Sequence, residues 1–342
     1  ETGEPYLMFE DAVNADLPDF QKRKGLYVNH SNLCSEITLA TNEERTAVCC
    51  LSSVNLEYYD EWSKTPAFIP DLVRMLDNVL EYFINNAPSQ MEKAKYSALR
   101  ERSIGLGAMG FHAYLQRNNI PFESIGAAGK NHEMFKTIKE KALEETRRLA
   151  VERGACPDDD SCEVRNAHLL AIAPNASSSI ICGNTSPSIE PFRANAFTQK
   201  TKSGSFLQKN KYVEQLLDKK GMNTDSVWKD IVANKGSVQH LEILTPEEKE
   251  VFKTAVEINQ SWVVEHAAER QQFICQSQSV NLFFPPDVNK GELHNVHMLA
   301  WAKNLKTLYY LRSEAISRAD NVSNKVKREI IFEQEDCLAC EG

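Results

Sequence analysis

Asn32-Leu33-Cys34-Ser35-Glu36 places an amide, a thiol and a carboxylate at alternate positions of one short segment. Because side chains alternate along an extended chain, an extended segment would present all three groups on one face. A thiol can act as a nucleophile or a hydrogen-atom donor, a carboxylate can transfer a proton, and an amide can hold a hydroxyl group. A buried cysteine is more often a small hydrophobic residue than a reactive one. The pattern therefore marks a candidate reaction centre without specifying its reaction.

The composition is that of an ordinary globular protein. The chain has 342 residues, of which 42% are hydrophobic and 25% are charged, enough for a large core in one or two domains. A net charge of -9 without a basic stripe argues against nucleic-acid binding. The chain has neither an apolar run of about 20 residues nor a signal-peptide pattern, which predicts a cytoplasmic protein without a membrane span. Nine scattered cysteines do not resemble a secreted disulfide framework and point to reactive thiols.

Three stretches carry apolar residues at helical spacing. The first opens at Pro70-Asp71, where the missing proline N–H has no helical partner to lose. The second covers 131–153, followed by Gly154, and the third opens at Thr245-Pro246-Glu247-Glu248, which matches a capping box. The residues expected to face the core are Leu72, Val73, Leu76, Val79, Leu80 and Phe83 in the first helix, Met134, Phe135, Ile138, Ala142 and Leu149 in the second, and Val251, Phe252, Ala255, Val256 and Trp262 in the third.

Short apolar runs of strand length lie before, between and after these helices. They are expected at 5–10, 26–28, 36–39, 169–173 and 279–284, bounded by proline or polar residues. Strands that alternate with long helices are typical of an α/β chain with a largely parallel sheet.

Residues 105–110, Gly-Leu-Gly-Ala-Met-Gly, match the glycine spacing of dinucleotide-binding loops. The preceding residues 97–102 are too charged for a buried first strand, and no second strand ends in an acidic residue about 20 positions later. The glycines therefore favour a tight turn into a helix around Phe111 to Leu115.

Pro174-Asn175-Ala176-Ser177-Ser178-Ser179-Ile180 follows an apolar run and can open a helix. A strand that ends in a small-residue turn at a helix start aims backbone N–H groups outward, which suits a phosphate. A serine-rich capped turn without a ligand fits the pattern equally well. In the loop at 188–193, Arg193 can pair with a substrate or with Glu190, and the sequence leaves both open.

The last apolar part of the chain combines a helical pattern with a strand pattern. Residues 306–311 are expected to form a strand that contains the adjacent Tyr309 and Tyr310. Paired tyrosines in a strand usually pack in a core, and spacing alone does not reveal their alternative use as one-electron carriers. Four residues at helical spacing indicate one packed helix face rather than a metal site: His294, His297, Trp301 and Leu305.

From Ser313 onward the sequence is charged and polar, which predicts a mobile tail. The tail ends in Cys337-Leu338-Ala339-Cys340, a cysteine pair without nearby histidine or cysteine residues to complete a zinc site. Dithiol exchange needs only two sulfurs and freedom to reach a target disulfide, so it is favoured over metal binding. The acidic residues around the pair disfavour dithiol exchange, since they raise the pKa values of the two thiols.

Six motifs in a fixed order resemble the large subunit of class I ribonucleoside-diphosphate reductase. They are Asn-Leu-Cys-x-Glu at 32–36, Val-Cys-x-Leu at 48–51, Pro-x-x-Ser-x-Ser at 174–179, Ser-Ile-Glu-Pro at 188–191, Thr-Leu-Tyr-Tyr at 307–310 and the terminal cysteine pair. Each match is modest, but their order along the whole chain is specific.

The resemblance implies a fold and a domain division. The chain is expected to be the C-terminal half of a ten-stranded α/β barrel with a central finger loop that carries Cys34. Residues 1–312 would form this partial catalytic domain, and 313–342 would form the flexible redox tail. About half of a large subunit would be missing, including the regulatory nucleotide sites, so another polypeptide would have to complete the barrel. We expect no nucleotide reduction by this chain with the small subunit alone.

The resemblance also implies a role for each site residue. Cys34 would become the thiyl radical that removes the 3′ hydrogen of a ribonucleoside diphosphate. Glu36 would accept the 3′-hydroxyl proton, Asn32 would hold a substrate hydroxyl, and Cys49 would be one of two reducing thiols. The adjacent Cys50 should face away and be structural. The diphosphate would lie on a turn of five residues: Asn175, Ala176, Ser177, Ser178 and Ser179.

The implied partners deliver radicals and electrons. Tyr309 and Tyr310 would relay a radical from a small subunit of the dimetal-tyrosyl type. Cys337 and Cys340 would re-reduce the active-site disulfide and would in turn be reduced by thioredoxin or glutaredoxin. The chain itself would bind no metal or cofactor, and nucleotide effectors would bind the missing half. A non-catalytic reductase-like subunit, or a thiol-redox protein built on the terminal pair, stays open as an alternative. Reductases that use adenosylcobalamin or a glycyl radical fit this C-terminus poorly.

Overall fold

The computed structural model describes residues 3–201 and 204–313 of the chain. Its centre is a row of parallel backbone segments. β2 (Leu51–Asn55) pairs with β3 (Gly105–Met109) in parallel, from Leu51 opposite Gly105 to Asn55 opposite Met109. Parallel bridges continue the row from Leu106 to Leu170 and from Ile172 to Gln278. The predicted α/β chain is therefore confirmed, and its central row is parallel, whereas two strand pairs outside this row are antiparallel.

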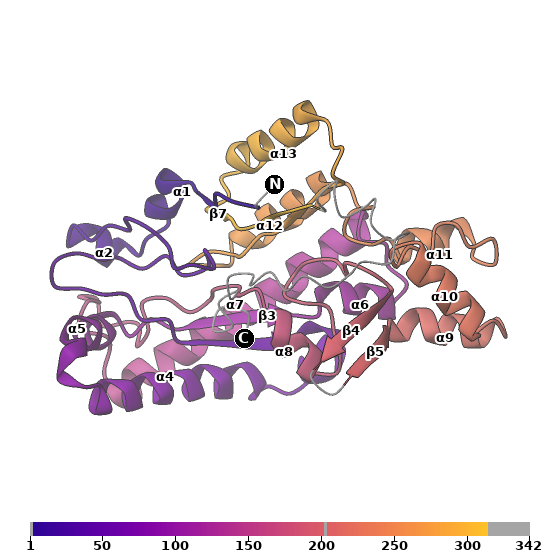
Figure 1. Ribbon diagram of the computed structural model, residues 1–342. Coiled ribbons are helices and arrows are strands. Elements are labelled where there is room, and N and C mark those ends of the chain that lie inside the picture. Colours follow the sequence, from indigo (N-terminus) through magenta and orange to yellow (C-terminus); the bar gives the residue numbers. More distant parts are fainter. Residues whose placement is uncertain (1–2, 202–203, 314–342) are drawn as a thin grey trace.

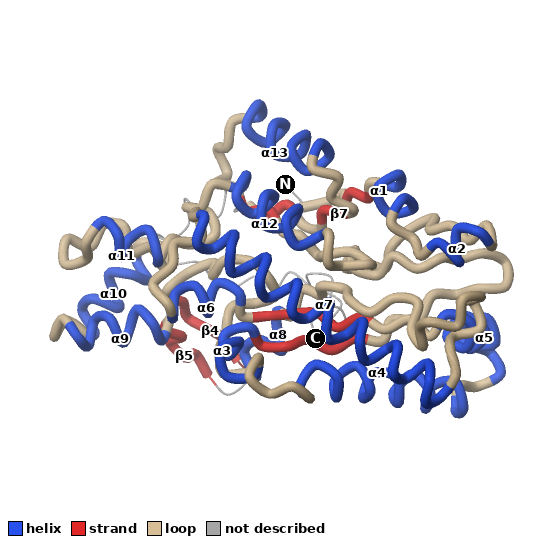
Figure 2. Tube along the Cα trace, turned by 180° about the vertical axis from the view of Figure 1, so that it is seen from behind, coloured by secondary structure: helices blue, strands red, loops and turns tan. Residues whose placement is uncertain are grey.

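Two long helices, α4 (Phe68–Asn86) and α7 (Ile125–Arg153), pack against each other and cover this row (Figures 1 and 2). Both were predicted, although α7 starts six residues before 131 because Ser124 caps it by accepting a hydrogen bond from the Ala127 N–H. The predicted core residues of α7 are all buried. In α4, Val79 is 52% exposed, so its prediction as a core residue is wrong. None of the helices in the described ranges is both long enough and apolar enough to cross a bilayer.

A second hydrophobic cluster around Trp228 lies at one end of the molecule in both views (Figures 1 and 2). It contains residues of β4 (Ala196–Thr201), α9 (Lys211–Lys219), α10 (Asp225–Ala233) and α11 (Pro246–Val251). β5 (Gly204–Lys209) pairs with β4 in antiparallel.

The helix predicted from Thr245 through Trp262 is interrupted. Its capping box is confirmed, since the Thr245 hydroxyl accepts from the Glu248 N–H and the Glu248 carboxylate accepts from the Thr245 N–H. After α11, the Thr254 N–H and hydroxyl donate to Glu257 and the Ala255 N–H donates to the Phe192 carbonyl. These bonds lie outside a helical ladder, so Trp262 belongs to a separate helix, α12 (Gln260–Gln271).

The shorter elements complete the fold. They are α1 (Glu10–Ala15), α2 (Asp19–Arg23), η1 (Leu56–Tyr58), α3 (Tyr59–Trp62), η2 (Ser89–Met91), α5 (Glu92–Glu101), α6 (Phe111–Arg117), α8 (Ala176–Ile181) and α13 (Lys290–Ala302), with β1 (Leu7–Met8) antiparallel to β7 (Thr307–Leu308) and β6 (Leu282–Phe283) parallel to β8 (Leu311–Arg312).

Several short predicted strands differ from the structure. Residues 26–28 and 36–39 are loops, and only Leu7–Met8 of the run at 5–10 is a strand. In 279–284 only β6 is a strand, and 169–173 contributes isolated bridges. The strand expected at 306–311 is split into β7 and β8 at the two tyrosines. Backbone hydrogen bonds to distant segments hold these residues, such as those from the Ser279 N–H to the Ile172 carbonyl and from the Tyr309 N–H to the Val280 carbonyl. Local propensity does not encode such pairings.

The helix face predicted near the end of the described chain is wrong. In α13 the buried residues are Val296 and Ala300, whereas His294 and Trp301 are exposed to solvent. Val296 and Ala300 are four residues apart and therefore define the side of the helix that faces the core. Leu305 is buried but follows the helix.

The glycine-rich run 105–110 forms a buried strand rather than a turn for five of its six residues. A Cβ on Gly105 would lie 2.3 Å from Leu51 Cδ2, and one on Gly107 would lie 2.5 Å from the Ala171 carbonyl oxygen. Glycine is therefore needed because the neighbouring segments approach closely. Only Gly110, with φ of 82°, makes the predicted turn into α6.

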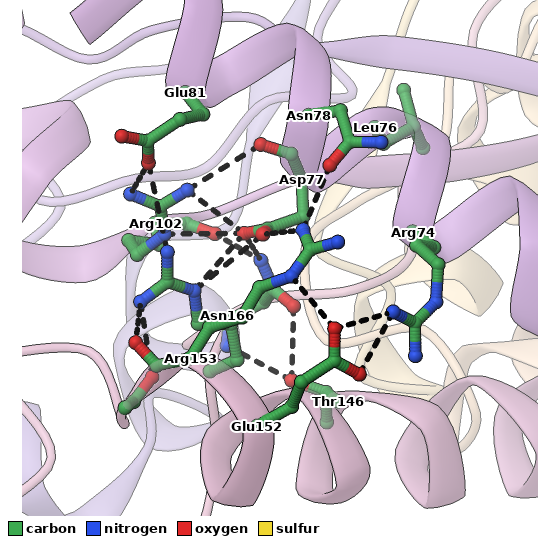
Figure 3. A network of polar contacts seen from close by, with 12 residues as sticks. Arg74, Leu76, Asp77, Asn78, Glu81, Arg102, Thr146, Glu152, Arg153 and Asn166 are labelled. Atoms are coloured by element: carbon green, nitrogen blue, oxygen red, sulfur yellow. Dashed lines mark hydrogen bonds and ion pairs between the residues drawn. The ribbon is translucent and has the colours of Figure 1, made fainter.

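A buried carboxylate, Asp77 of α4, joins the surrounding elements (Figure 3). It accepts hydrogen bonds from Arg102 at the end of α5 (3.0 Å) and from Arg153 at the end of α7 (3.0 Å). Arg165 and Asn166 donate to it from the segment that leads into the parallel row. Burial alone would raise the pKa of Asp77, but the charges of Arg102 and Arg165 lower it.

We expect Asp77→Asn to lower the free energy of unfolding by about 3–5 kcal/mol at neutral pH, since it removes the buried counter-charge of Arg102 and leaves this arginine only its ion pair with the exposed Glu81. Because the pKa of Asp77 is lowered in the folded state, its contribution is complete above about pH 4. It is lost as the pH falls from there through the folded-state pKa. Urea unfolding measured between pH 3 and 7 checks both expectations.

The matched control is Asn78→Ala on the same helix, which removes an exposed contact of 2.7 Å to Arg153. It should change the stability by about 0.5 kcal/mol or less. Equal losses in the two variants would show that the Asp77 cluster does not stabilise the fold.

Candidate functional site

The segment 32–36 forms a tight loop rather than an extended face. The Ser35 N–H donates to the Asn32 carbonyl (3.1 Å), and the Ile37 N–H donates to the Asn32 side-chain oxygen (3.0 Å). Ser35 takes a left-handed conformation with φ of 70°. The prediction of an extended segment is therefore wrong, although the loop still brings Asn32 and Glu36 together. Cys34 lies at the turn and is buried, with 5% of its surface exposed.

Two distant segments meet this loop. The Ser279 hydroxyl lies 2.5 Å from the Cys34 carbonyl oxygen and 3.2 Å from Glu36 Oε2. The Tyr309 hydroxyl lies 3.7 Å from the Cys34 sulfur. A thiol and a carboxyl of one loop, the Ser279 hydroxyl and the Tyr309 phenol are thus assembled from three parts of the chain.

Glu36 is a carboxyl group set up for proton transfer. It is 2% exposed, and burial raises its pKa above the ordinary value. Hydrogen bonds from its own backbone, from Asn32 and from Ser279 act in the opposite direction but do not cancel the effect of burial. A raised pKa makes a carboxylate a stronger base, which suits a group that accepts a proton.

Three tyrosine rings extend outward from Cys34. The ring centroids of Tyr309 and Tyr310 are 4.3 Å apart, and Tyr6 lies 4.8 Å from Tyr309 and 4.9 Å from Tyr310. Burial and the contact with Cys34 raise the pKa of Tyr309, so its phenol keeps its proton. Sequence reasoning missed Tyr6, because only the pairing of β1 with β7 brings it beside the other two.

A cavity of about 560 Å³ opens beside these rings. Tyr309 and Tyr310 line one part of it, Leu33 of the Cys34 loop another, and α8 a third. Further lining comes from a loop and two strand regions: Thr185, Pro187, Glu190, Phe192, Arg193, Asn281 and Arg312.

Only three of the five residues of the predicted serine turn line the cavity. These are Ala176, Ser177 and Ser179. Asn175 is buried instead, and its amide donates to Ser53 Oγ (3.0 Å) and to two backbone carbonyls. Ser178 donates to Asn175 (3.3 Å). These two residues therefore fix the start of α8 against the parallel row and present the other three.

The loop at 188–193 supplies charged groups to the same cavity. Glu190 accepts from the Asn281 amide (3.0 Å), and burial raises its pKa. The charge of Arg193 acts on Glu190 in the opposite direction, while the Arg193 side chain also lines the cavity. Arg193 is therefore placed to pair with Glu190 and also to contact a substrate in the cavity.

The two adjacent cysteines have opposite environments. Cys49 is exposed and lines a smaller cavity of about 200 Å³ together with Asn32. Cys50 is buried against α4, with its sulfur 3.6 Å from the Leu76 carbonyl oxygen. Burial and the charge of Asp77 raise the pKa of Cys50 to about 11. Cys50 is thus an inert thiol at neutral pH, whereas Cys49 is accessible. Cys337 and Cys340 lie outside the described residues.

A family model described as ribonucleotide reductase, barrel domain, matches residues 1–163 and 160–311. The chain is 48% identical over its whole length to the ribonucleoside-diphosphate reductase large subunit of Invertebrate iridescent virus 3, of which it covers 55%. It is also 48% identical to a putative large subunit of Frog virus 3, of which it covers 60%.

Among solved structures, the chain resembles the Actinobacillus ureae class Id ribonucleotide reductase alpha subunit, with 43% identity and a TM-score of 0.86. The match covers 92% of this chain and 58% of that one. The predicted α/β barrel fold is therefore confirmed. The chain spans little more than half the length of these relatives.

We expect Ser279→Ala to raise the pKa of Glu36 further, since it removes a hydrogen bond that stabilises the ionised carboxylate. Titration of the Glu36 carboxyl by isotope-edited infrared spectroscopy measures the change. Ser53→Ala, which removes a hydroxyl that contacts Asn175, is the control and should leave this pKa unchanged. A Glu36 titration that is the same in all three proteins would contradict the assigned contact.

Proposed function

The chain belongs to the family of ribonucleoside-diphosphate reductase large subunits, and on that premise we propose that it carries the catalytic part of a ribonucleotide reductase. The proposed reaction converts ribonucleoside diphosphates into deoxyribonucleoside diphosphates. The observation that carries it is the contact of 3.7 Å between the Tyr309 hydroxyl and the buried Cys34 sulfur, beside a cavity.

The proposed chemistry begins at this contact. A Tyr309 phenoxyl radical takes the hydrogen atom of the Cys34 thiol, which leaves a phenol and a thiyl radical. The thiyl removes the 3′ hydrogen of the ribose, and Glu36 accepts the 3′-hydroxyl proton while Asn32 holds a substrate hydroxyl. Burial of Cys34 supports this role, because a thiyl radical must be shielded from reductants in solvent.

The remaining site residues supply electrons and bind the substrate. Cys49 and a second thiol outside this chain provide the two electrons as the 2′-hydroxyl leaves as water, and they form a disulfide. The diphosphate lies against the start of α8, with Ala176, Ser177 and Ser179 at the cavity and with Asn175 and Ser178 as their support.

Further partners follow from the same proposal. Tyr310 passes the radical to Tyr309 from a small subunit of the dimetal-tyrosyl type, and the rings in contact support such a path. Cys337 and Cys340 carry electrons from thioredoxin or glutaredoxin to the active-site disulfide. We place the nucleotide effectors on residues outside this chain.

We also propose that further polypeptide completes the barrel. The strands within 3–201 and 204–313 form four two-stranded sheets, and a closed ten-stranded barrel needs more strands than these. The length of the relatives leaves room for them.

We expect Cys34→Ser, in the reductase assembled with its complementing chain and small subunit, to lower nucleotide reduction by at least about 10³-fold. Serine keeps the size of the side chain but does not give a stable radical. Cys50→Ala is the control and should retain reduction, with a loss of stability of about 1 kcal/mol. Product analysis by chromatography decides the result. A Cys34→Ser protein that still reduces nucleotides would support a thiol carrier instead.

Tyr309→Phe should also abolish reduction, since it keeps the ring but removes the hydroxyl that exchanges a hydrogen atom with Cys34. Its stability should stay within about 1.5 kcal/mol of the parent protein. Tyr114→Phe removes a different phenol hydroxyl, bonded to Asp60 at 3.1 Å, and should stay active. Turnover and electron paramagnetic resonance of the assembled enzyme measure the result. Nucleotide reduction by the Tyr309→Phe protein would show that the radical reaches Cys34 without Tyr309.

A further inference from the structure

Away from the Cys34 site, four side chains form a network of polar contacts, most of it buried. Cys275 follows α12, His168 precedes the 169–172 segment of the parallel row, Gln21 lies on α2, and Glu101 ends α5. His168, Gln21 and Glu101 are almost completely buried, and Cys275 is half-buried. None of them takes part in the chemistry described above.

The hydrogen bonds of this network indicate which nitrogen of His168 carries a proton. Glu101 accepts from the hydroxyls of Ser97 and Ser103 (both 2.9 Å) and from the Gln21 side-chain NH₂ group (3.3 Å). The Gln21 amide is thereby oriented with its oxygen toward His168 Nε2, at 3.0 Å. An amide oxygen can only accept, so Nε2 carries a proton.

The other nitrogen of His168 is then directed at Cys275. Nδ1 is fully buried and makes no hydrogen bond of normal length to any residue that the structure describes. Its interaction with the Cys275 sulfur is one of those that lower the pKa of the thiol. A base that is itself oriented by a third group therefore interacts with the Cys275 thiol, which is the arrangement of sites where a base activates a thiol.

The surroundings of the sulfur favour its negative form. The backbone N–H groups of Leu169 and Leu170 point at Cys275 Sγ, at 3.0 and 3.3 Å. The Lys306 ammonium binds the Cys275 carbonyl (2.9 Å) and Asp16 (2.6 Å). Burial by itself would raise the pKa of Cys275, but the charges of Lys139 and His168 and the Leu169 N–H lower it to about 5.

We propose that Cys275 is an activated thiolate that reacts with hydroperoxides, with His168 as its proton partner and Gln21 as the residue that orients His168. The sulfur attacks one peroxide oxygen, and an S–O bond forms as the O–O bond breaks. The sulfur loses two electrons and becomes a sulfenic acid. The leaving oxygen takes the His168 proton, and the peroxide is reduced to water or an alcohol.

The charges facing the sulfur come from every neighbouring element. Lys139 of α7, Lys306 before β7 and the interaction with His168 favour the thiolate. Asp16 opposes them but is bound to Lys306, and Glu101 is separated from the sulfur by Gln21 and His168. The site is distinct from Cys34 and does not depend on the proposed reductase activity.

The test is alkylation of the folded full chain by iodoacetamide at pH 4–9, with each cysteine quantified by mass spectrometry. An ordinary thiol becomes roughly tenfold more reactive per pH unit up to about pH 8.5. The rate at Cys275 should instead be constant from about pH 6 upward. Limited access lowers this rate equally at every pH, so the midpoint of the profile, not the absolute rate, decides. A Cys275 midpoint near pH 8.5 would overturn the proposal.

Two variants separate the relay from general effects of substitution. His168→Gln should shift the Cys275 midpoint upward and abolish its sulfenic acid adduct with dimedone after treatment with hydrogen peroxide. His266→Gln, which alters a buried histidine bonded to the Phe122 carbonyl, should leave both unchanged. An unchanged midpoint in His168→Gln would refute its role. If that variant fails to fold, the pH profile of the parent protein still decides whether Cys275 is a thiolate.

Discussion

The hydrogen bonds of Ser279 hold the candidate site together. Its backbone N–H donates to the Ile172 carbonyl in the parallel row, and its hydroxyl contacts both the Cys34 carbonyl and Glu36. One residue thus joins the sheet to a loop that lies 245 positions earlier in the chain. The position of the Cys34 sulfur against the Tyr309 hydroxyl depends on this connection, since Tyr309 donates its own N–H to Val280, the next residue.

Two buried acids show how the environment sets their chemistry. Asp77 is surrounded by arginines, so its pKa is lowered and it remains a fixed charge that joins helices. Glu36 receives hydrogen bonds from neutral groups only, so burial prevails and its pKa is raised. The first acid stabilises the fold and the second can exchange a proton. The same contrast separates Cys50, whose pKa burial raises, from Cys275, whose pKa nearby cations lower.

The close approach of the parallel segments explains why these groups meet. Leu51 and Ala171 lie so close to Gly105 and Gly107 that a Cβ on either glycine would clash with them. Glycine at these two positions therefore lets the neighbouring segments approach closely. The ends of the segments then lie together: Ser53 contacts Asn175 at the start of α8, and the Cys34 loop reaches Ser279. The cavity forms where these ends and the tyrosines converge.

The sequence by itself determined α4, most of α7, the capping box of α11, the turn at Gly110 and the family motifs, because each depends on residues close together in the chain. Only the tertiary structure decided that 105–109 is a strand, that the helix from Thr245 stops at Val251, that the Cys34 segment is a turn, and that Tyr6 joins the tyrosine pair. It likewise brought His168 to Cys275. These features arise from contacts between distant segments, and backbone groups there bond to partners that no local pattern specifies.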